Sequence, residues 1–299
     1  MSIKFSLNHR KASYSKKPED SSLSGKGFSL KGENGATVIL IHGLTGTPNE
    51  MRYTANSLNR KGYSIVCPRL ANHGEPMAIL KRTTWQDFYQ SVKEAFISIE
   101  SSAGGAPIFV AGLCMGALLG LLLADEFGDR VAGVSCLSVT LFYDGWSVPW
   151  QRCFLPLAYW TPIKHFFYFK EEPPYGIKDG TIRRRVHQYY SKATLDDLEG
   201  VMESGYPYVP VTLLYQNHLL VKWVMKRLPS IKVSVQLIQA KDDDTTSVKN
   251  SEFVYDRIGS EVKEMVLLED SYHLITIDRE RDKVATKIDE FFSRLMVRS

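Results

Sequence analysis

Continuous runs of apolar and β-branched residues alternate along the chain with segments that have a helical period. Six such runs lie at 36–41, 63–68, 108–113, 131–139, 233–238 and 264–268. Runs of this length are typical of strands that are buried on both faces of a parallel sheet. The pattern therefore predicts six strands in one mostly parallel sheet.

Helices are predicted in the segments between the strands. Thr47 and Glu50 have the spacing of a capping box around Pro48, which suits the first position of a helix. A second helix is predicted to begin after the cap residue Thr84, with its apolar positions on one face. Further helices are expected at 115–127, 248–258 and 279–296. This alternation predicts an α/β fold with helices on both faces of the sheet.

Two segments break the alternation. Residues 141–229 hold several prolines and many aromatic residues, and their period is helical rather than that of strands. We interpret them as a mainly helical lid with an apolar pocket wall, inserted between the core segments 36–140 and 230–299. Residues 1–35 are rich in Ser, Lys and Gly, so they are expected to form an extended or loosely docked N-terminal arm.

The composition is that of an ordinary globular protein. The 299 residues are 44% hydrophobic and 23% charged, with a formal net charge of +4. One α/β domain with a large insertion fits this length as well as two small domains do. No basic stretch is interleaved with aromatic residues, so a nucleic-acid partner is not expected.

Compartment and redox state follow from the apolar runs and the cysteines. The first ten residues are polar and lack the apolar core of a signal peptide, and the run at 117–124 is too short to span a bilayer. The chain has no C-x-x-C pair, which argues against a zinc site and a disulfide framework; its cysteines are Cys67, Cys114, Cys136 and Cys153. We therefore expect a cytoplasmic protein with free thiols, no metal site and no stable membrane insertion.

The strand at 108–113 leads into Gly112-Leu113-Cys114-Met115-Gly116, which has the spacing of a G-x-S-x-G nucleophile elbow with cysteine at its centre. Such a turn points the central side chain out at the end of the strand. Its two glycines remove Cβ atoms that would clash where the backbone doubles back. Cys114 is therefore the candidate nucleophile, and the alternative is a small buried residue in a tight connection.

Two further candidate groups follow later strands. The acidic segment 239–244 comes directly after the strand at 233–238, and His273 lies in the loop after the strand at 264–268. Each lies at a strand end on the same edge of the predicted sheet as Cys114. Nucleophile, acid and base in this chain order are the arrangement used with such elbows. The sequence thus predicts nucleophilic acyl chemistry at this edge.

Together these motifs resemble the α/β-hydrolase superfamily, and within it the small carboxylesterases and monoacylglycerol-lipase-like enzymes. The matching pieces are 42–46, 72–74, 112–116, 239–243 and 271–273. The resemblance implies that Cys114 replaces the family's serine, that His273 is the base and that Asp243 is the acid. Asp242 and Asp244 stay open as alternatives for the acid.

The resemblance also implies an oxyanion hole and the absence of a cofactor. The hole is formed by the backbone N–H groups of Leu44 and Met115, whose side chains need not take part. His42 and His73 match loop histidines, for which structural roles are expected.

Cysteine at the elbow changes the expected chemistry. A thiol beside an imidazole at a helix N-terminus ionises readily, and its acyl-enzyme is a reactive thioester. Dienelactone hydrolases and polyhydroxyalkanoate synthases of this superfamily also have cysteine there, although the chain is short for a polymerase. We predict a hydrolase that cleaves an ester or thioester of an apolar acyl group. The alternatives are an acyltransferase that passes the acyl group to an alcohol or amine, and a non-catalytic ligand-binding protein on the same fold.

Overall fold

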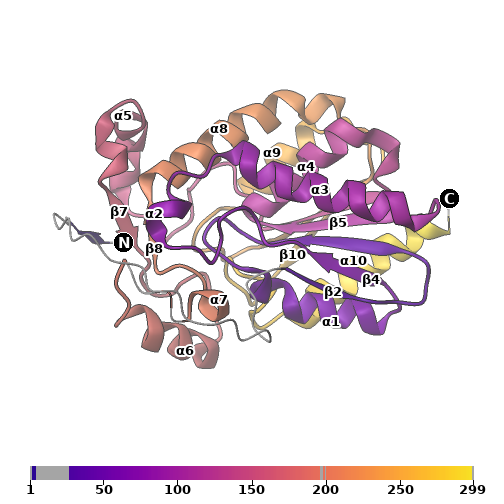
Figure 1. Ribbon diagram of the computed structural model, residues 1–299, viewed down its shortest axis with the longest axis horizontal. Coiled ribbons are helices and arrows are strands. Elements are labelled where there is room, and N and C mark those ends of the chain that lie inside the picture. The colour runs from indigo at the N-terminus through magenta and orange to yellow at the C-terminus, as the bar shows by residue number, and fades with distance from the viewer. Residues whose placement is uncertain (1, 5–26, 196–197, 199, 298–299) are drawn as a thin grey trace.

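The computed structural model describes residues 2–4, 27–195, 198 and 200–297 (Figure 1). Most of the predicted N-terminal arm, residues 5–26, lies outside the described residues.

Within the described residues, a seven-stranded sheet forms the centre of the molecule (Figure 1). Its order is β10-β9-β6-β5-β3-β4-β2, and all neighbours are parallel except β2, which is antiparallel to β4. The strands are β2 (Phe28–Leu30), β3 (Thr37–Ile41), β4 (Ser64–Cys67), β5 (Ile108–Leu113), β6 (Gly133–Leu137), β9 (Val235–Ala240) and β10 (Lys263–Leu268). The six predicted strands are confirmed, with ends shifted by at most two residues.

Helices cover both faces of this sheet. One face packs against α1 (Arg52–Arg60) and α10 (Arg281–Met296). The other packs against α3 (Trp85–Ala103), α4 (Met115–Phe127) and α9 (Lys249–Arg257), and α8 (Val211–Arg227) packs on the outer side of α3 and α4. The predicted α/β architecture is therefore confirmed.

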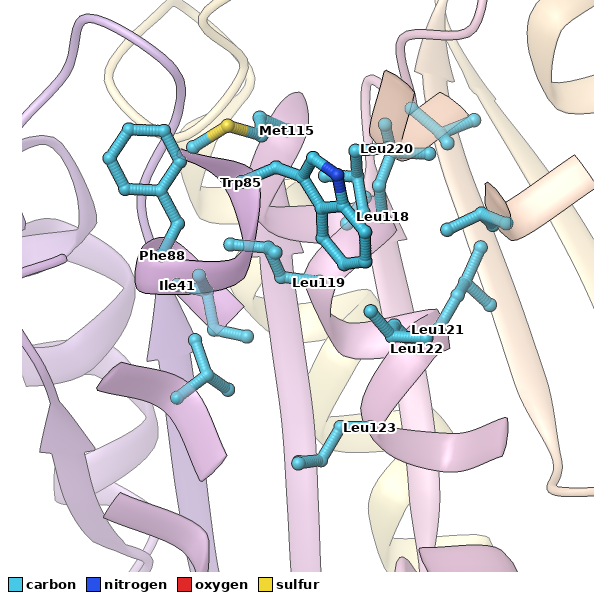
Figure 2. Packing of buried hydrophobic residues seen from close by; sticks show 14 of the residues in the cluster. Ile41, Trp85, Phe88, Met115, Leu118, Leu119, Leu121, Leu122, Leu123 and Leu220 are labelled. Carbon is cyan, nitrogen blue, oxygen red and sulfur yellow. The ribbon is translucent and has the colours of Figure 1, made fainter. Parts of the chain in front are cut away.

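The residues of α4 from Met115 to Ala124 are all apolar, and all of them are buried. Figure 2 shows its leucines between the sheet and two neighbouring helices, with Trp85 and Phe88 contributed by α3 and Leu220 by α8. Leu118, Leu119, Leu121 and Leu123 are completely buried. This packing accounts for the apolar run at 117–124. No helix in the described part of the chain combines the length and apolarity needed to cross a membrane.

The segment between β6 and β9 is mixed in structure. It contains η3 (Trp150–Phe154), α5 (Leu155–Tyr159), η4 (Pro162–His165), β7 (Tyr168–Lys170), α6 (Gly180–Tyr190), α7 (Val201–Ser204), β8 (Tyr208–Pro210) and α8. β7 pairs with β8 and with β1 (Ser2–Lys4) to form a small antiparallel sheet. The sequence predicted no strands here, because strands of three residues are too short to show an alternating pattern. We refer to residues 141–210 as the cap.

The predicted capping box at Thr47 is wrong. A 3-10 turn, η1 (Pro48–Met51), precedes α1, and the side chain of Thr47 makes no capping hydrogen bond. The carboxylate of Glu50 instead accepts a hydrogen bond from the backbone N–H of Gly43, at 2.5 Å. A contact seven residues back along the chain thus replaces the local one. The cap predicted at Thr84 is confirmed, and Asp87 returns the bond, so that the two residues form a capping box.

Candidate active site

Cys114 lies in the turn between β5 and α4, at the carboxyl edge of the sheet. Its φ of 56° and ψ of −114° are rare for a residue other than glycine, and such strain is typical of nucleophile elbows. A Cβ on Gly112 would lie 2.2 Å from the carbonyl oxygen of Gly116. One on Gly116 would lie 2.3 Å from the carbonyl oxygen of Ile41. Both positions therefore require glycine.

Substitution of Gly116 by alanine should prevent folding or lower the free energy of unfolding by more than about 3 kcal/mol, because the new methyl group meets backbone atoms. Gly120→Ala in the same helix is the matched control. Its new Cβ lies 3.1 Å from a side-chain carbon of Val110, which can shift, and alanine is the better helix former. Urea unfolding of both variants checks this, and equal stabilities would contradict it.

The structure brings His273 and Asp243 together beside the elbow. Asp243 follows β9 and His273 follows β10. The ring Nδ1 of His273 lies 2.9 Å and 3.1 Å from the two carboxylate oxygens of Asp243. Cys114 lies close enough to His273 to raise the pKa of its ring. All three side chains are almost fully buried. The three residues singled out by sequence order are thus in contact.

The carboxylate of Asp243 is held by donors from its own loop. Its Oδ1 accepts the backbone N–H groups of Thr245 and Thr246, both at 2.8 Å, and its Oδ2 accepts the side-chain amide of Gln239 at 2.7 Å. These bonds stabilise the ionised carboxylate and fix its orientation toward His273.

Neighbouring charges determine the protonation state of the His273 ring. Burial lowers the pKa of His273, but the charges of Asp243 and of an ionised Cys114, with hydrogen bonds to both, outweigh burial and hold that pKa well above its usual value. The imidazolium form of His273 is therefore favoured beside the Asp243 carboxylate. The ring's loop is fixed as well, since the Ser138 hydroxyl donates to the backbone carbonyl of His273 at 2.8 Å.

The two alternative acids lie elsewhere. Asp242 is exposed, and its carboxylate lies 3.3 Å from the ammonium of Lys178. Asp244 is buried and accepts the backbone N–H groups of Gly176, at 3.1 Å, and of His273, at 3.4 Å. Asp244 thus connects the cap to the loop of His273, a contact that chain order did not reveal.

Thr140 is a further neighbour of the thiol. Its hydroxyl lies 3.1 Å from Cys114 Sγ and 3.1 Å from the backbone carbonyl of Ser138, as donor in both cases. The Thr140 hydroxyl can rotate from the Ser138 carbonyl to the Cys114 sulfur and donate to that sulfur when the sulfur is negatively charged. Sequence analysis missed this residue, because nothing in its local pattern distinguishes it from other residues after a strand.

Two buried histidines order the loop that holds Leu44. His42 Nε2 accepts the backbone N–H of Leu70 at 3.2 Å, and His73 Nε2 lies 2.9 Å from the Leu44 carbonyl oxygen. Burial lowers the pKa of His42 well below its usual value and that of His73 to about 4. Both rings are therefore neutral at physiological pH and act as structural hydrogen-bonding groups.

Glu50 supports the same loop from the pocket side. Its Oε1 accepts the Gly43 N–H, and a Cβ on Gly46 would lie 2.1 Å from its Oε2, so the loop wraps closely around this carboxylate. Burial raises the pKa of Glu50 to about 7, although the Gly43 bond and the charge of His273 oppose this. Sequence analysis assigned Glu50 to a helix cap and missed its place in the site.

Replacing Glu50 by glutamine should change how stability depends on pH. The folded state binds the Glu50 proton more tightly than the unfolded state, so this group's contribution is complete at low pH. It is lost as the pH rises from about 4.5 through about 7. Glutamine keeps an acceptor for Gly43 but cannot ionise. The difference in melting temperature between Glu50→Gln and wild type should therefore change with pH. It should become more favourable to the variant from about pH 5 to about pH 8, the range in which Glu50 of the wild type ionises.

The control for this comparison is Glu261→Gln, which removes a carboxylate from the exposed turn before β10. If the melting temperature of Glu50→Gln depended on pH in the same way as that of the control, the raised pKa of Glu50 would be contradicted.

A pocket of about 200 Å³ opens onto the thiol. Cys114, His273 and Leu44 line it from the sheet edge, and Leu155 and Phe169 line it from the cap. Most of its surface is apolar, but four acidic residues also line it: Glu50, Glu171, Glu172 and Asp244. The site can therefore receive a molecule with an apolar portion next to a thiol and an imidazole. Met115, at the start of α4, follows Cys114 directly.

The family model described as Serine aminopeptidase, S33 (Hydrolase_4) matches residues 32–280. The chain belongs to this α/β-hydrolase family. In this chain Cys114 lies at the centre of the elbow between Gly112 and Gly116. Family membership places the chain among enzymes of the lipase and esterase kind.

Curated relatives match over nearly the whole length of this α/β-hydrolase. A thermostable monoacylglycerol lipase from Bacillus sp. (strain H-257) is 27% identical over 265 residues, which cover 88% of this chain and 92% of the relative. A carboxylesterase from Bacillus subtilis (strain 168) is 25% identical over 270 residues, which cover 90% of this chain and 97% of the carboxylesterase.

Solved structures agree with the fold. The structure described for the metagenome-derived lipolytic enzymes LipS and LipT superposes with a TM-score of 0.73 at 26% identity, covering 90% of this chain and 98% of that one. A soluble variant of monoglyceride lipase from Saccharomyces cerevisiae has a TM-score of 0.70 at 16% identity, and the match covers 96% of this chain and 97% of the lipase. The second likeness concerns the fold alone.

No group of three or more His, Cys, Asp or Glu side chains in the described ranges of this α/β-hydrolase could hold a metal ion.

Proposed function

We propose that the protein hydrolyses carboxylic esters of apolar acyl groups, with Cys114 as the nucleophile, His273 as the acid–base group and Asp243 as its orienting acid. The observation that carries this proposal is the contact chain from Asp243 through His273 to a strained elbow cysteine that lines a mostly apolar pocket. The names of the two Bacillus relatives, a monoacylglycerol lipase and a carboxylesterase, support an ester substrate.

The proposed reaction has two steps. The Cys114 thiolate attacks the ester carbonyl carbon, and the oxyanion that forms is bound by the backbone N–H groups of Leu44 and Met115. The imidazolium of His273 gives its Nε2 proton to the leaving alcohol as the C–O bond breaks, which leaves a thioester on Cys114. Water then attacks the thioester while His273 takes its proton, and the acid product leaves as the thiolate and imidazolium are restored.

Each neighbouring group has a part in this scheme. Asp243 stabilises the imidazolium, and Thr140 is placed to donate to the thiolate sulfur. Glu50, His42 and His73 hold the loop that presents the Leu44 amide. Glu50, His42 and His73 act only through the position of this loop, so we regard these three as positioning residues.

Acyl transfer is a second candidate because the nucleophile is a thiol. A thioester intermediate is nearly equal in energy to a thioester donor, and it reacts with alcohols and amines as well as with water. A donor thioester could therefore replace the ester, and an alcohol or amine could replace water as the acceptor.

The test is product analysis by mass spectrometry. The protein is incubated with p-nitrophenyl and glycerol monoesters of increasing chain length and with acyl thioesters, each with and without glycerol or an alkylamine. Free acid as the product from esters supports hydrolysis. Acylated glycerol or amide as the main product supports transfer, and no turnover of any donor would contradict both.

A further inference from the structure

The turn after β6 contacts both Cys114 and the loop of His273. Ser138 in this turn has a φ of 45°, a left-handed value that is uncommon for a residue other than glycine. The Ser138 hydroxyl donates to the His273 carbonyl at 2.8 Å, and two residues later the Thr140 hydroxyl donates to Cys114 Sγ at 3.1 Å. All four residues are buried. One short, strained turn thus connects the nucleophile and the base of the proposed reaction.

The backbone is fixed on both sides of Thr140. Before it, the Ser138 N–H donates to a carbonyl of β9 at 2.9 Å. After it, the N–H groups of Leu141 and Phe142 donate to the side-chain oxygen of Asn250, at 2.9 Å and 2.7 Å, and Asn250 is completely buried. Because these bonds hold the turn from both ends, the Thr140 hydroxyl is positioned against the sulfur before any substrate binds.

The Thr140 hydroxyl has one proton and two acceptors. The Ser138 carbonyl oxygen and Cys114 Sγ both lie 3.1 Å from its oxygen. The sulfur of a neutral thiol or thioester is a weak acceptor, whereas an ionised sulfur is a much stronger one. The proton is therefore expected to lie toward the carbonyl when the sulfur is neutral and toward the sulfur when the sulfur is negatively charged.

We propose that Thr140 is a catalytic residue of this site and that its hydroxyl stabilises the ionised sulfur of Cys114. The inference rests on the proposed role of Cys114 as the nucleophile. The sulfur is negatively charged before it attacks the ester carbonyl. It is negatively charged again when the C–S bond of the thioester breaks and leaves its electron pair on the sulfur. Thr140 donates a hydrogen bond at both points and keeps its proton, while His273 gives and takes the protons of the reaction.

This hydroxyl also makes the elbow selective for sulfur over oxygen. A serine nucleophile loses its proton to the base as its bond to carbon forms, so a full negative charge does not build up on its oxygen. A donor in the position of Thr140 then has little charge to stabilise. Thr140 should therefore affect the reaction strongly with cysteine at position 114 and only weakly with serine there.

Three titratable side chains from three elements also lie near the sulfur. His273 follows β10 and Tyr143 follows β6, and the charge of Cys114 acts on the pKa of both. Glu50 belongs to η1, and a Cβ on Gly43 would lie 3.3 Å from its Oε1 and 3.6 Å from Cys114 Cβ. Replacement of Thr140 leaves these three groups in place, so a change in the pH dependence of the sulfur's reactivity would report the lost hydrogen bond.

The rate at which iodoacetamide alkylates Cys114, measured against pH, tests the proposal. All proteins carry Cys153→Ser, which removes the exposed cysteine, and peptide mapping separates the label on Cys114 from any on the buried Cys67 and Cys136. In Thr140→Val the profile should move to higher pH by at least about one unit, because a hydrogen bond to a charged group is lost. Thr140→Ser keeps the hydroxyl and should restore the original profile.

Two further variants separate the hydrogen bond from packing. Thr54→Val removes a hydroxyl from a threonine on α1 that is also completely buried, and it should leave the profile unchanged. Thr140→Ala lacks the hydroxyl but adds no methyl group beside the Ser138 carbonyl, so it tests the same bond if valine does not fit. Its profile should move as far as that of Thr140→Val. Melting temperatures are measured in parallel.

A second measurement compares kcat/KM for a short-chain ester in the cysteine and serine proteins. Thr140→Val should lower kcat/KM at least about fivefold with cysteine at position 114, and less than about twofold in the Cys114→Ser background. Alkylation does not require turnover, so an absence of ester hydrolysis in the wild type would leave the first test intact.

Three outcomes would overturn the proposal. One is an alkylation profile that stays in place in both Thr140→Val and Thr140→Ala. Another is a shift that Thr140→Ser does not restore, because the hydroxyl would then not be its cause. The third is an equal loss of kcat/KM on replacing Thr140 in the cysteine and serine proteins.

Discussion

Replacement of Cys114 by alanine should reduce kcat/KM for a short-chain ester by at least about 10³-fold. The variant keeps the pocket, His273 and the loop amides, but it has no atom that can form the acyl intermediate. The alanine must adopt the φ of 56° that the elbow imposes, so its fold is checked by circular dichroism and melting. A folded Cys114→Ala protein with full activity would contradict the assignment of the nucleophile.

Cys114→Ser separates the role of the elbow from the role of the thiol. Serine fits the same turn and can use His273 as a base, so measurable ester hydrolysis is expected to remain. Reaction with iodoacetamide at this position should disappear, and any acyl transfer from thioester donors should fall more than hydrolysis does. An equal loss of both reactions would show that the thiol has no special part in transfer.

Replacement of Asp243 by asparagine should produce the second large effect, a loss of about 10³-fold or more in kcat/KM. The carboxylate is completely buried and contacts both the imidazole and the loop amides of Thr245 and Thr246. An amide in its place stabilises neither the imidazolium nor the ring orientation that reaction requires. Asp242→Asn, on the exposed neighbour, is the matched control and should retain activity.

The same substitution has an expected effect on the pH profile. Asp243 is a main cause that raises the pKa of His273, so its loss lowers that pKa. His273 then loses its proton at lower pH and can no longer protonate a leaving alcohol. The alkaline limb of kcat/KM for an alkyl ester should therefore move to lower pH in Asp243→Asn. An unmoved limb with a lower maximum would instead indicate a purely structural role for Asp243.

The sheet could be predicted from the sequence because each strand is marked by its own residues. Six runs of apolar residues, bounded by glycine, proline or polar residues, specify β3, β4, β5, β6, β9 and β10 to within two residues. The edge strand β2 and the cap strands β7 and β8 could not be predicted. They are three residues long, and their pairing partners lie far along the chain.

The contact of Cys114, His273 and Asp243 could be predicted because parallel strands bring their carboxyl ends to one edge. Thr140, Glu50 and Asp244 could not, since their roles depend on side-chain directions across loops. Glu50 shows the reason most clearly, because its spacing from Thr47 satisfies a capping pattern while its carboxylate turns to Gly43.

The positions of the aromatic residues in the cap could be predicted from the sequence only in part. Composition predicted an apolar pocket wall, and Tyr143, Phe169 and Tyr190 do line the pocket. Trp150 and Trp160 instead face outward, and no periodic pattern in so short a helix as α5 could have separated the two groups.

The most direct test of the account is the intact mass of the protein after brief mixing with an activated short-chain ester, followed by peptide mapping. The proposed reaction predicts one added acyl group, located on the peptide that contains Cys114 and absent in Cys114→Ala. Turnover of the ester with the acyl group on another residue, or with undiminished turnover in Cys114→Ala, would contradict it.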